Sequence, residues 1–370
     1  MIVQEGLTKL VIPKSYLSKI HFFNPKVEMS RDLSILVLNT LRSKDWLVCD
    51  ALAGTGARGV RIAKETQVKE VWINDWSKDA LKYAEKSIAL NRVKGKVKIF
   101  NKDAKILLVE NKRTFDHVDI DPFGSPIYYF DACAEAVKRK SLLGFAATDT
   151  APLSGVNPLT CLRRYGTRSL RTDFFKELGL RILLGSTALL FSRYFFSIQP
   201  ILSYSSEHYY RVWLKLEKKR SKTTESLKRD LGHLSYCSNC LWRSFGEELK
   251  KKCEYCGSDC EIVFNVWLGK IEDEGFIKDC LKKLEKLEWL KTRKKMFKLL
   301  EFLKNENLIF YYDVHELCGK IKVKVPSFDS LIEKLRDMGY GAERTHFSNR
   351  GIKTNAPLKE LIKILRKSNL

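Results

Sequence analysis

The sequence has no long uncharged apolar run. No stretch reaches the roughly eighteen apolar residues that a membrane-spanning helix requires, since the best candidate, LLGSTALLF, is bounded by Arg181 and Arg193. The first residues, MIVQEGLTKLVIP, lack the basic start and apolar core of a secretory signal. Internal repeats and low-complexity tracts are also missing. We therefore expect a cytoplasmic protein without membrane contact, and the sequence indicates no obligate protein partner.

Acidic residues are few relative to basic ones. Lys and Arg number 67 against 44 Asp and Glu, which gives a formal net charge of +23. The excess gathers in the segments 214–230, 247–252 and 290–298. A single run of this kind is more often a solvated face than a binding surface. Because all three share one sign, we expect one broad basic surface that attracts polyanions in a salt-dependent way.

Length and composition predict two domains. A chain of 370 residues that is 44% hydrophobic can fill two cores. The alternating segment 209–217 is typical of a late antiparallel strand, so we expect the first domain to cover residues 1–217. The charged stretch that follows is expected to be a linker into a second domain, residues 218–370.

A glycine-rich turn follows the first strong strand pattern. The apolar run WLVCDALA, residues 46–53, leads directly into Gly54-Thr55-Gly56-Ala57-Arg58-Gly59 and then into helix-forming residues. Gly54 and Gly56 permit positive φ and let a ligand approach the backbone. Asp75 ends the next apolar run and can accept hydrogen bonds from two ribose hydroxyls. A purely structural turn would use the same glycines, and the pattern alone does not distinguish NAD from S-adenosylmethionine.

Two later acids narrow the choice of nucleotide. VKIFNKDAK, residues 97–105, is predicted to be a third strand ending at Asp103, whose carboxylate could hold adenine together with the Ala104 backbone N–H. FDHVDID supplies a fourth strand, followed by Asp121-Pro122-Phe123-Gly124. An acid, a proline and an aromatic ring at this edge of an open α/β sheet have no evident use in a dehydrogenase. The combination favours methyl transfer from S-adenosylmethionine to an exocyclic amine.

The chemistry of such an amine explains the residue types. An amino nitrogen conjugated to a purine is a poor nucleophile, so a carboxylate must accept its proton as positive charge develops. Asp121 would do so while Phe123 stacks on the base, which is worth about 1–3 kcal/mol. Taken alone, an Asp-Pro pair is usually only a turn, and the catalytic interpretation depends on the nucleotide-binding half that precedes it.

Four cysteines have the spacing of a zinc knuckle. Cys237 and Cys240 form one CxxC pair, and Cys253 and Cys256 form a second. Two such pairs hold a tetrahedral zinc ion through four thiolates, which leaves no open position and indicates a structural metal. Cys260 could replace Cys256 as the fourth ligand. The other five cysteines are expected to be small buried apolar residues, because disulfides are improbable without a secretory signal.

The last hundred residues are predicted to be mostly helical. Segments 278–306, 313–321 and 327–339 have helical periodicity, and residues 340–357 are expected to form a hairpin. Helices followed by a hairpin are winged-helix-like, a shape suited to a nucleic-acid backbone, although a purely structural small α/β domain would show the same pattern. His346 is expected to be structural rather than catalytic.

These motifs resemble those of the tRNA (guanine-26-N2)-dimethyltransferases of archaeal and eukaryotic type. The resemblance extends nearly end to end. It is carried by the two strings above, the four-cysteine segment, FFNPKVEMSRDLS (22–34), ATDTAPLSG (147–155), RYGTRSLRTDFFKELGLRILLG (164–185) and THFSNRGIKTNAP (345–357). It implies an α/β fold, namely a Rossmann-like S-adenosylmethionine-dependent methyltransferase sheet with a second, smaller α/β C-terminal domain that contains a zinc knuckle.

The resemblance also assigns roles to residues. It implies cofactor contacts by Arg31 and Arg58 at the methionine end, by Asp75 at the ribose, and by Asp103 with Ala104 at the adenine. Asp121 matches the catalytic acid, and Phe22 and Phe123 match the aromatic pair that sandwiches the target guanine, although Phe22-Phe23 departs from the usual Phe-Tyr. The N-terminal segment would then fold as a flap over the pocket. The implied reaction consumes two S-adenosylmethionine molecules for each dimethylguanine in tRNA.

Two alternatives stay open at this stage. One is an amino-methyltransferase that acts on adenine, cytosine or guanine of another nucleic acid, since the acid-proline-aromatic box is shared. The other is a non-catalytic, zinc-containing tRNA-binding protein whose nucleotide fold is vestigial.

Overall fold

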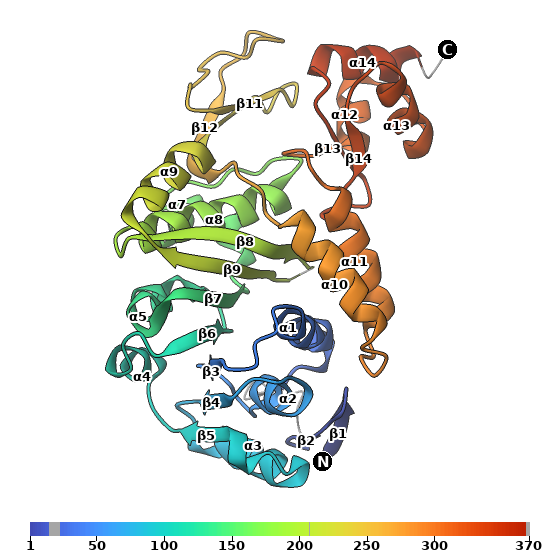
Figure 1. Cartoon of the computed structure of the whole chain (residues 1–370). Helices are drawn as coiled ribbons and strands as arrows, with labels where there is room; N and C mark the ends of the chain where they lie inside the picture. The colour runs from blue at the N-terminus through green and yellow to red at the C-terminus, as the bar shows by residue number, and fades with distance from the viewer. Residues whose placement is uncertain (15–22, 207, 368–370) are drawn as a thin grey trace.

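The centre of the molecule is a seven-stranded sheet (Figure 1). The structure is a computed structural model and describes residues 1–14, 23–206 and 208–367. The strands lie in the order β5-β4-β3-β6-β7-β9-β8. Their bounds are β3 Leu47–Asp50, β4 Glu70–Asn74, β5 Val97–Phe100, β6 Phe115–Ile120, β7 Val137–Ala147, β8 Phe196–Ser205 and β9 Tyr210–Lys218.

The sheet is parallel except at one strand. The pairs β5/β4, β4/β3, β3/β6 and β6/β7 are parallel, whereas β9 runs antiparallel to both β7 and β8. The predicted late antiparallel strand at 209–217 is therefore confirmed as β9. The strand order reverses beside β3, where open α/β sheets bind ligands outside the carboxyl ends of their strands.

Helices cover both faces of this sheet (Figure 1). On one face a core forms around three helices, and on the other face a second core forms around three more. The first set is α1 Glu28–Thr40, α2 Ala57–Glu65 and α3 Lys78–Asn91; the second is α4 Ala104–Glu110, α5 Phe130–Ala136 and α8 Phe175–Ser192. Strands buried on both faces are expected to be continuously apolar, as VWI in β4 is.

Short elements close the edges of this layer. The N-terminal hairpin of β1 Ile2–Glu5 and β2 Thr8–Val11 packs against α2 and α3. The shorter helices that join the strands and helices are η1 Pro25–Val27, η2 Lys94–Lys96, η3 Pro126–Tyr129, α6 Thr150–Leu153 and α7 Pro158–Tyr165. Among the described residues, no helix is both long enough and apolar enough to cross a membrane.

The linker expected after residue 217 is instead a helix. Helix α9, Arg220–Asp230, packs against β8 and buries Thr223, Ser226 and Asp230. Its polar sequence hid this packing, because small polar side chains and one acid form its buried face. A three-stranded antiparallel sheet follows in the order β11-β10-β12, with β10 Leu231–Tyr236, β11 Arg243–Gly246 and β12 Glu261–Trp267.

The helices and hairpin predicted near the C-terminus are present. The segment 278–306 lies in two helices, α10 Glu274–Glu285 and α11 Arg293–Asn305, which pack on α1 (Figure 1). The next elements are β13 Tyr312–Asp313, α12 Val314–Ile321, α13 Phe328–Asp337, β14 Ala342–Arg344, β15 Gly351–Thr354 and α14 Leu358–Lys367. β15 pairs antiparallel with both β13 and β14.

Buried charges join α8 to this C-terminal part. Lys353 is 1% exposed and lies 3.3 Å from Glu177 of α8 and 3.0 Å from Glu306. The His346 Nδ1–H donates a 2.8 Å hydrogen bond to the Glu306 carboxylate, in line with its expected structural role. Burial opposes ionisation of Glu306, but His346 and Lys353 together lower its pKa to about 2. The two parts of the chain are thus held together by ion pairs as well as by apolar packing.

Candidate active site and candidate metal centre

A cavity of about 510 Å³ lies at the carboxyl ends of β3, β4 and β6. The predicted residues that line it are Arg31, Gly54, Arg58, Asp75, Asp103, Ala104, Asp121 and Phe123. Phe22, the other aromatic of the predicted pair, lies outside the described residues. Residues predicted from segments far apart in the sequence therefore meet around one cavity.

Gly56 is the predicted cofactor residue that does not line the cavity. It caps the N-terminus of α2 with φ +74°, a conformation that favours glycine. A Cβ at this position would come within 2.7 Å of the Ala84 Cβ in α3. Gly56 thus allows α2 to begin close to α3, while the neighbouring Gly54 presents its backbone at the cavity.

Asp75 is held rigidly at the end of β4. Its Oδ2 accepts a 2.8 Å hydrogen bond from the Gly54 N–H, and its Oδ1 accepts one of the same length from Ser77. Burial raises the pKa of the carboxyl, while these two N–H groups act in the opposite direction. Each carboxylate oxygen has two lone pairs, so each can still accept a hydrogen bond from a hydroxyl group. This arrangement fits the two hydroxyls of a ribose.

Asp103 differs from the sequence prediction in its local structure. Strand β5 ends at Phe100, and Asp103 is the N-cap of α4. Its Oδ1 accepts hydrogen bonds from the N–H groups of Lys105 and Ile106, at 2.8 and 3.3 Å. Its Oδ2 has no hydrogen-bond partner in the described part of the chain. Capping therefore orients the carboxylate, and Oδ2 and the Ala104 N–H are suited to an amino group and a ring nitrogen.

Asp121 follows β6 and forms an ion pair with Arg58 through Oδ2. Arg58 is 6% exposed and also donates a 2.6 Å hydrogen bond to the Ser34 hydroxyl. The Asp121 side chain is 31% exposed, and its Oδ1 takes part in no hydrogen bond with any described residue. The acid is thus anchored on one oxygen and available on the other.

Further buried charged residues lie beside Arg58 and hold its guanidinium in place. Asp119, at 0% exposure, lies between Arg58, 3.3 Å away, and Arg211. Burial opposes its ionisation, but Arg211 and Arg58 hold the pKa of Asp119 well below its usual range. Burial raises the pKa of the neighbouring Asp50 to about 7, against the effect of Arg58 and the Gly59 N–H. The cluster fixes the Arg58 guanidinium at the cavity wall.

Arg31 is a buried residue of α1 rather than a solvated charge. Its guanidinium donates to both oxygens of Glu5, at 2.7 and 2.5 Å, and to the Asn24 carbonyl at 3.0 Å. It also lies over the Phe23 ring, 4.9 Å from the ring centre. The segment from Phe23 to Arg31 therefore lies against the cavity, as expected for a flap.

Aromatic side chains surround the opening. Phe123 is 90% exposed on its loop, which is tied down where the Gly124 N–H donates to the Thr148 hydroxyl at 2.6 Å. Trp76, Tyr129 and Phe23 also line the cavity, and sequence reasoning missed all three. Trp76 follows Asp75 directly, so its position could have been found from that of the acid. Phe23 belongs to the Phe22-Phe23 doublet, in which the resemblance assigned the stacking role to Phe22, and nothing in the local sequence distinguishes Tyr129.

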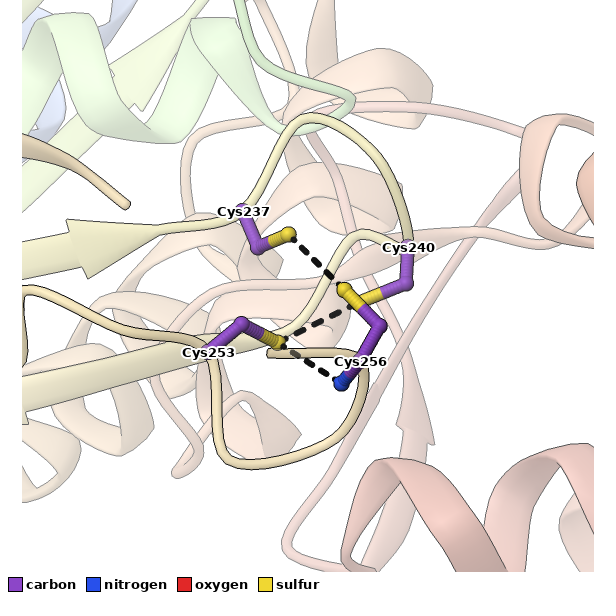
Figure 2. A group of neighbouring side chains, drawn as sticks. All are labelled: Cys237, Cys240, Cys253 and Cys256. Atoms are coloured by element: carbon purple, nitrogen blue, oxygen red, sulfur yellow. Dashed lines mark hydrogen bonds between the residues drawn. The ribbon is translucent and has the colours of Figure 1, made fainter. Parts of the chain in front are cut away.

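The four predicted cysteines form a second site, well away from this cavity in the sequence. Figure 2 shows their side chains facing one another from two turns, one after β10 and one before β12. Their sulfur atoms all lie within 4.8 Å of one another. The Cys237 and Cys256 sulfurs are 3.5 Å apart, and those of Cys240 and Cys253 are 3.4 Å apart.

This geometry fits a tetrahedral zinc ion. Zinc–sulfur bonds of about 2.3 Å place tetrahedral sulfurs about 3.8 Å apart, close to the spacing of this group. Cys260, the alternative fourth ligand, is not among the four residues that the described structure groups here. The other five cysteines are all buried, as expected: Cys49, Cys133, Cys161, Cys280 and Cys318.

The fold and the cavity together define a class of protein. In a mostly parallel α/β sheet, a glycine turn follows β3, the acids Asp75 and Asp103 follow β4 and β5, and Asp121 with Phe123 follows β6, all of them around one cavity. This is the arrangement of an S-adenosylmethionine-dependent methyltransferase.

Comparisons with known proteins identify the family within that class. A sequence profile of the N2,N2-dimethylguanosine tRNA methyltransferases matches residues 6–366. The chain is 38% identical to the tRNA (guanine(26)-N(2))-dimethyltransferase of Methanobrevibacter smithii, over 99% of this chain and 98% of that protein. It is 36% identical to the Pyrococcus abyssi enzyme, over 98% of each chain. The solved structure of Trm1 from Pyrococcus horikoshii with S-adenosyl-L-methionine is similar with a TM-score of 0.90 and 35% identity, over 99% of both chains. The chain belongs to the N2,N2-dimethylguanosine tRNA methyltransferase family.

Proposed function

We propose that this protein transfers two methyl groups from S-adenosylmethionine to the exocyclic N2 of guanine 26 in tRNA. The observation that carries the proposal is the placement of Asp121. Its anchored carboxylate and the exposed Phe123 ring share one cavity with the ribose-type acid Asp75 and the adenine-type acid Asp103. A base and a nucleoside cofactor can therefore be held side by side.

In this mechanism the cofactor supplies an electrophilic methyl group on a sulfonium, and the protein positions the amine. Asp121 accepts a hydrogen bond from the N2 amino group and then its proton as the nitrogen gains a methyl group. Arg58 holds the second oxygen of Asp121 and contacts the methionine end of the cofactor, together with Arg31. Asp75 binds the ribose, and Asp103 with Ala104 binds the adenine.

The target guanine must leave its stack in the tRNA and must then be held in the cavity. Guanine 26 lies within folded tRNA, so it must leave its stack, at a cost of a few kcal/mol. Phe123, at 90% exposure, offers a ring on which the base can stack, and Phe22 is proposed as its partner on the other side. A protein that only bound tRNA would have no need for an ion-paired acid beside this ring.

We assign catalysis to residues 1–217 and tRNA binding chiefly to residues 218–370. The order of α12, α13 and the β14/β15 hairpin supports this division, because helices followed by a wing suit a nucleic-acid backbone. The four-cysteine site, 237–256, would hold the adjoining sheet in place. Since tRNA is the substrate, we also propose that the enzyme acts in the cytoplasm.

The test is incubation of the purified chain with an unmodified tRNA transcript and methyl-labelled S-adenosylmethionine, followed by mass analysis of the nucleosides. We expect dimethylguanosine from the wild type. Asp121→Ala should lower the rate by about 10²–10⁴-fold, the contribution of a positioned proton acceptor.

The same analysis distinguishes the alternatives. Methylated adenosine or cytidine in place of dimethylguanosine would replace the proposed substrate with another base. Equal product from wild type and Asp121→Ala would remove the catalytic role of that acid. Tight tRNA binding without any methylated product would indicate a non-catalytic binding protein.

A further inference from the structure

A ridge beside the active site combines exposed apolar residues with exposed arginines. Leu159 and Leu162 on α7 are 66% and 41% exposed, and Val156 in the preceding loop is 60% exposed. Arg163, Arg168 and Arg171 are exposed on α7 and the segment after it. We name Val156, Leu159, Leu162, Arg163, Arg168 and Arg171 the α7 ridge. The mechanism above uses none of these side chains.

The α7 ridge is connected directly to the loop that carries Asp121 and Phe123. Tyr165, at the end of α7, forms a 2.6 Å hydrogen bond with the Ser125 hydroxyl and 2.8 Å hydrogen bonds with Asp149. Arg164 donates to Asp149 at 2.9 Å and to the Tyr128 hydroxyl at 3.1 Å. The ridge is therefore fixed close to the position where the target base must enter.

The two halves of the ridge are packed against each other. Gly155 has φ +84°, and a Cβ there would come within 2.2 Å of the Leu170 backbone. The Ser169 hydroxyl donates to the Pro152 carbonyl across the same contact. The loop with Val156 and the segment with Arg168 and Arg171 thus form one rigid surface. Its exposed side chains are not the result of a loose loop.

We propose that the α7 ridge binds the tRNA next to guanine 26, with its arginines on backbone phosphates and its apolar residues against the bases left behind when the guanine leaves the stack. Arginine is suited to phosphate oxygens, and apolar side chains inserted beside unstacked bases are a known way of stabilising a distorted duplex. The arginines favour an RNA over a second protein chain as the occupant. The inference rests on the proposed function, since it concerns the same substrate.

The first experiment tests the arginines. Arg163→Ala combined with Arg168→Ala should raise the Kd for tRNA about tenfold or more. The slope of log Kd against log salt concentration should fall by about two, because two phosphate contacts are lost. The matched control is Lys86→Ala with Lys94→Ala, two exposed lysines on α3 and η2 beside the β5 edge of the sheet, which should change neither quantity. Calorimetric binding of S-adenosylmethionine should be unchanged in both double variants, which excludes misfolding.

The second experiment tests the apolar residues. Leu159→Ser should lower kcat about tenfold on normal tRNA, because the variant stabilises the tRNA with the unstacked guanine less than wild type does. On a transcript whose nucleotide opposite guanine 26 is deleted, the base is unpaired and leaves the helix at a lower cost, so the variant should come within about twofold of wild type. Leu90→Ser, on α3, replaces another exposed leucine and serves as control.

Each outcome decides the inference. Absence of dimethylguanosine from the wild type would overturn the proposed function itself. If the wild type forms the product but the ridge variants match their controls, the ridge inference alone is overturned. It is also overturned if Leu159→Ser changes the oligomeric state and leaves tRNA kinetics unchanged, because the ridge would then be a protein interface.

Discussion

The two sites of this molecule are built in opposite ways. The cavity of the active site takes its lining from residues between Phe23 and Thr148, which a parallel sheet brings together. The four cysteines come from the single short segment 237–256. The cavity residues were predicted from strand and turn patterns and from the family resemblance, and the cysteines from their spacing, so the first site depends on the whole fold and the second mainly on its own ligands.

This difference should determine what a substitution does. Strands β3, β4 and β6 are buried between two helix layers, so the sheet holds its shape whether or not Asp121 is present. The second cysteine turn has little comparable packing, since Cys256 and its neighbours Glu254 and Tyr255 are exposed, whereas Cys237 and Leu241 of the first turn are buried. We therefore expect that loss of a cysteine ligand unfolds the cysteine turns locally. Loss of a side chain in the cavity should instead reduce activity or cofactor binding and leave the fold unchanged.

The largest effect is expected from Cys253→Ser. Structural zinc contributes about 10–16 kcal/mol to folding in isolated finger peptides, so loss of one ligand should remove the metal and the order of the turns. The measurements are metal content by mass spectrometry and amide hydrogen exchange over residues 236–261. Exchange in the seven-stranded sheet and binding of S-adenosylmethionine should be unchanged.

Cys260→Ser is the matched control for that experiment. Cys260 lies in the same segment but outside the group of four, so this variant should keep one zinc per chain. Metal loss in Cys260→Ser with retention in Cys256→Ser would show that the ligand set is different. Protection lost across both sheets in Cys253→Ser would mean that the two sites do not unfold separately.

Sequence reasoning predicted the acids that line the cavity because parallel strands present their carboxyl ends at one edge of the sheet. Asp75 and Asp121 follow apolar runs of strand length, and this places them without further information. Trp76 and Tyr129 were missed because an aromatic residue beside a strand, or in a short helix such as η3, is usually part of the core. Arg31 was assigned only through the family resemblance, since its Glu5 partner lies in a different element.

The C-terminal part was predicted less completely for a physical reason. Periodicity located α12, α13 and the hairpin, but α9 was interpreted as a linker because it is almost uniformly polar. The buried ion pairs of Lys353 with Glu177 and Glu306 were not predicted either. A lysine in a strand is normally exposed, and only the folded chain reveals acids from two other helical regions around it.

An effect of intermediate size is expected at the junction between the cysteine-bearing sheet and helix α10. Glu272 connects the cysteine-bearing sheet to α10, is 5% exposed, and its Oε2 has no hydrogen-bond partner among the described residues. Burial raises its pKa from 4.5 to about 8, with Glu306 and Glu177 adding to the effect and Lys353 and Arg181 opposing it. Because the folded state then binds more protons than the unfolded state, stability should fall as the pH rises from 4.5 to 8.

Glu272→Gln should remove this dependence. The free energy of unfolding of the wild type should decline relative to the variant by up to about 1.4 kcal/mol per pH unit in that interval, and the difference should level off above pH 8. Denaturant titrations at several pH values measure it. Parallel curves for the two proteins would show that Glu272 is already ionised in the folded chain and that the junction is better solvated than its burial indicates.

The smallest effect is expected at Asp103, whose side chain caps α4 and is proposed to bind the cofactor as well. Asn is as good an N-cap as Asp, so Asp103→Asn should keep the bonds to Lys105 and Ile106 and leave stability within about 0.5 kcal/mol of wild type. Its amide nitrogen, if it replaces Oδ2, cannot accept from the adenine amino group, and the Kd for S-adenosylmethionine should rise about tenfold. Asp103→Ala should show the same loss of affinity together with about 1 kcal/mol of lost stability, because the cap is also removed. Calorimetry and denaturant unfolding on both variants separate the two roles. If Asp103→Asn binds the cofactor as wild type does, the carboxylate is only a helix cap, and the adenine is held by the backbone at Ala104 and by the aromatic residues that share the cavity.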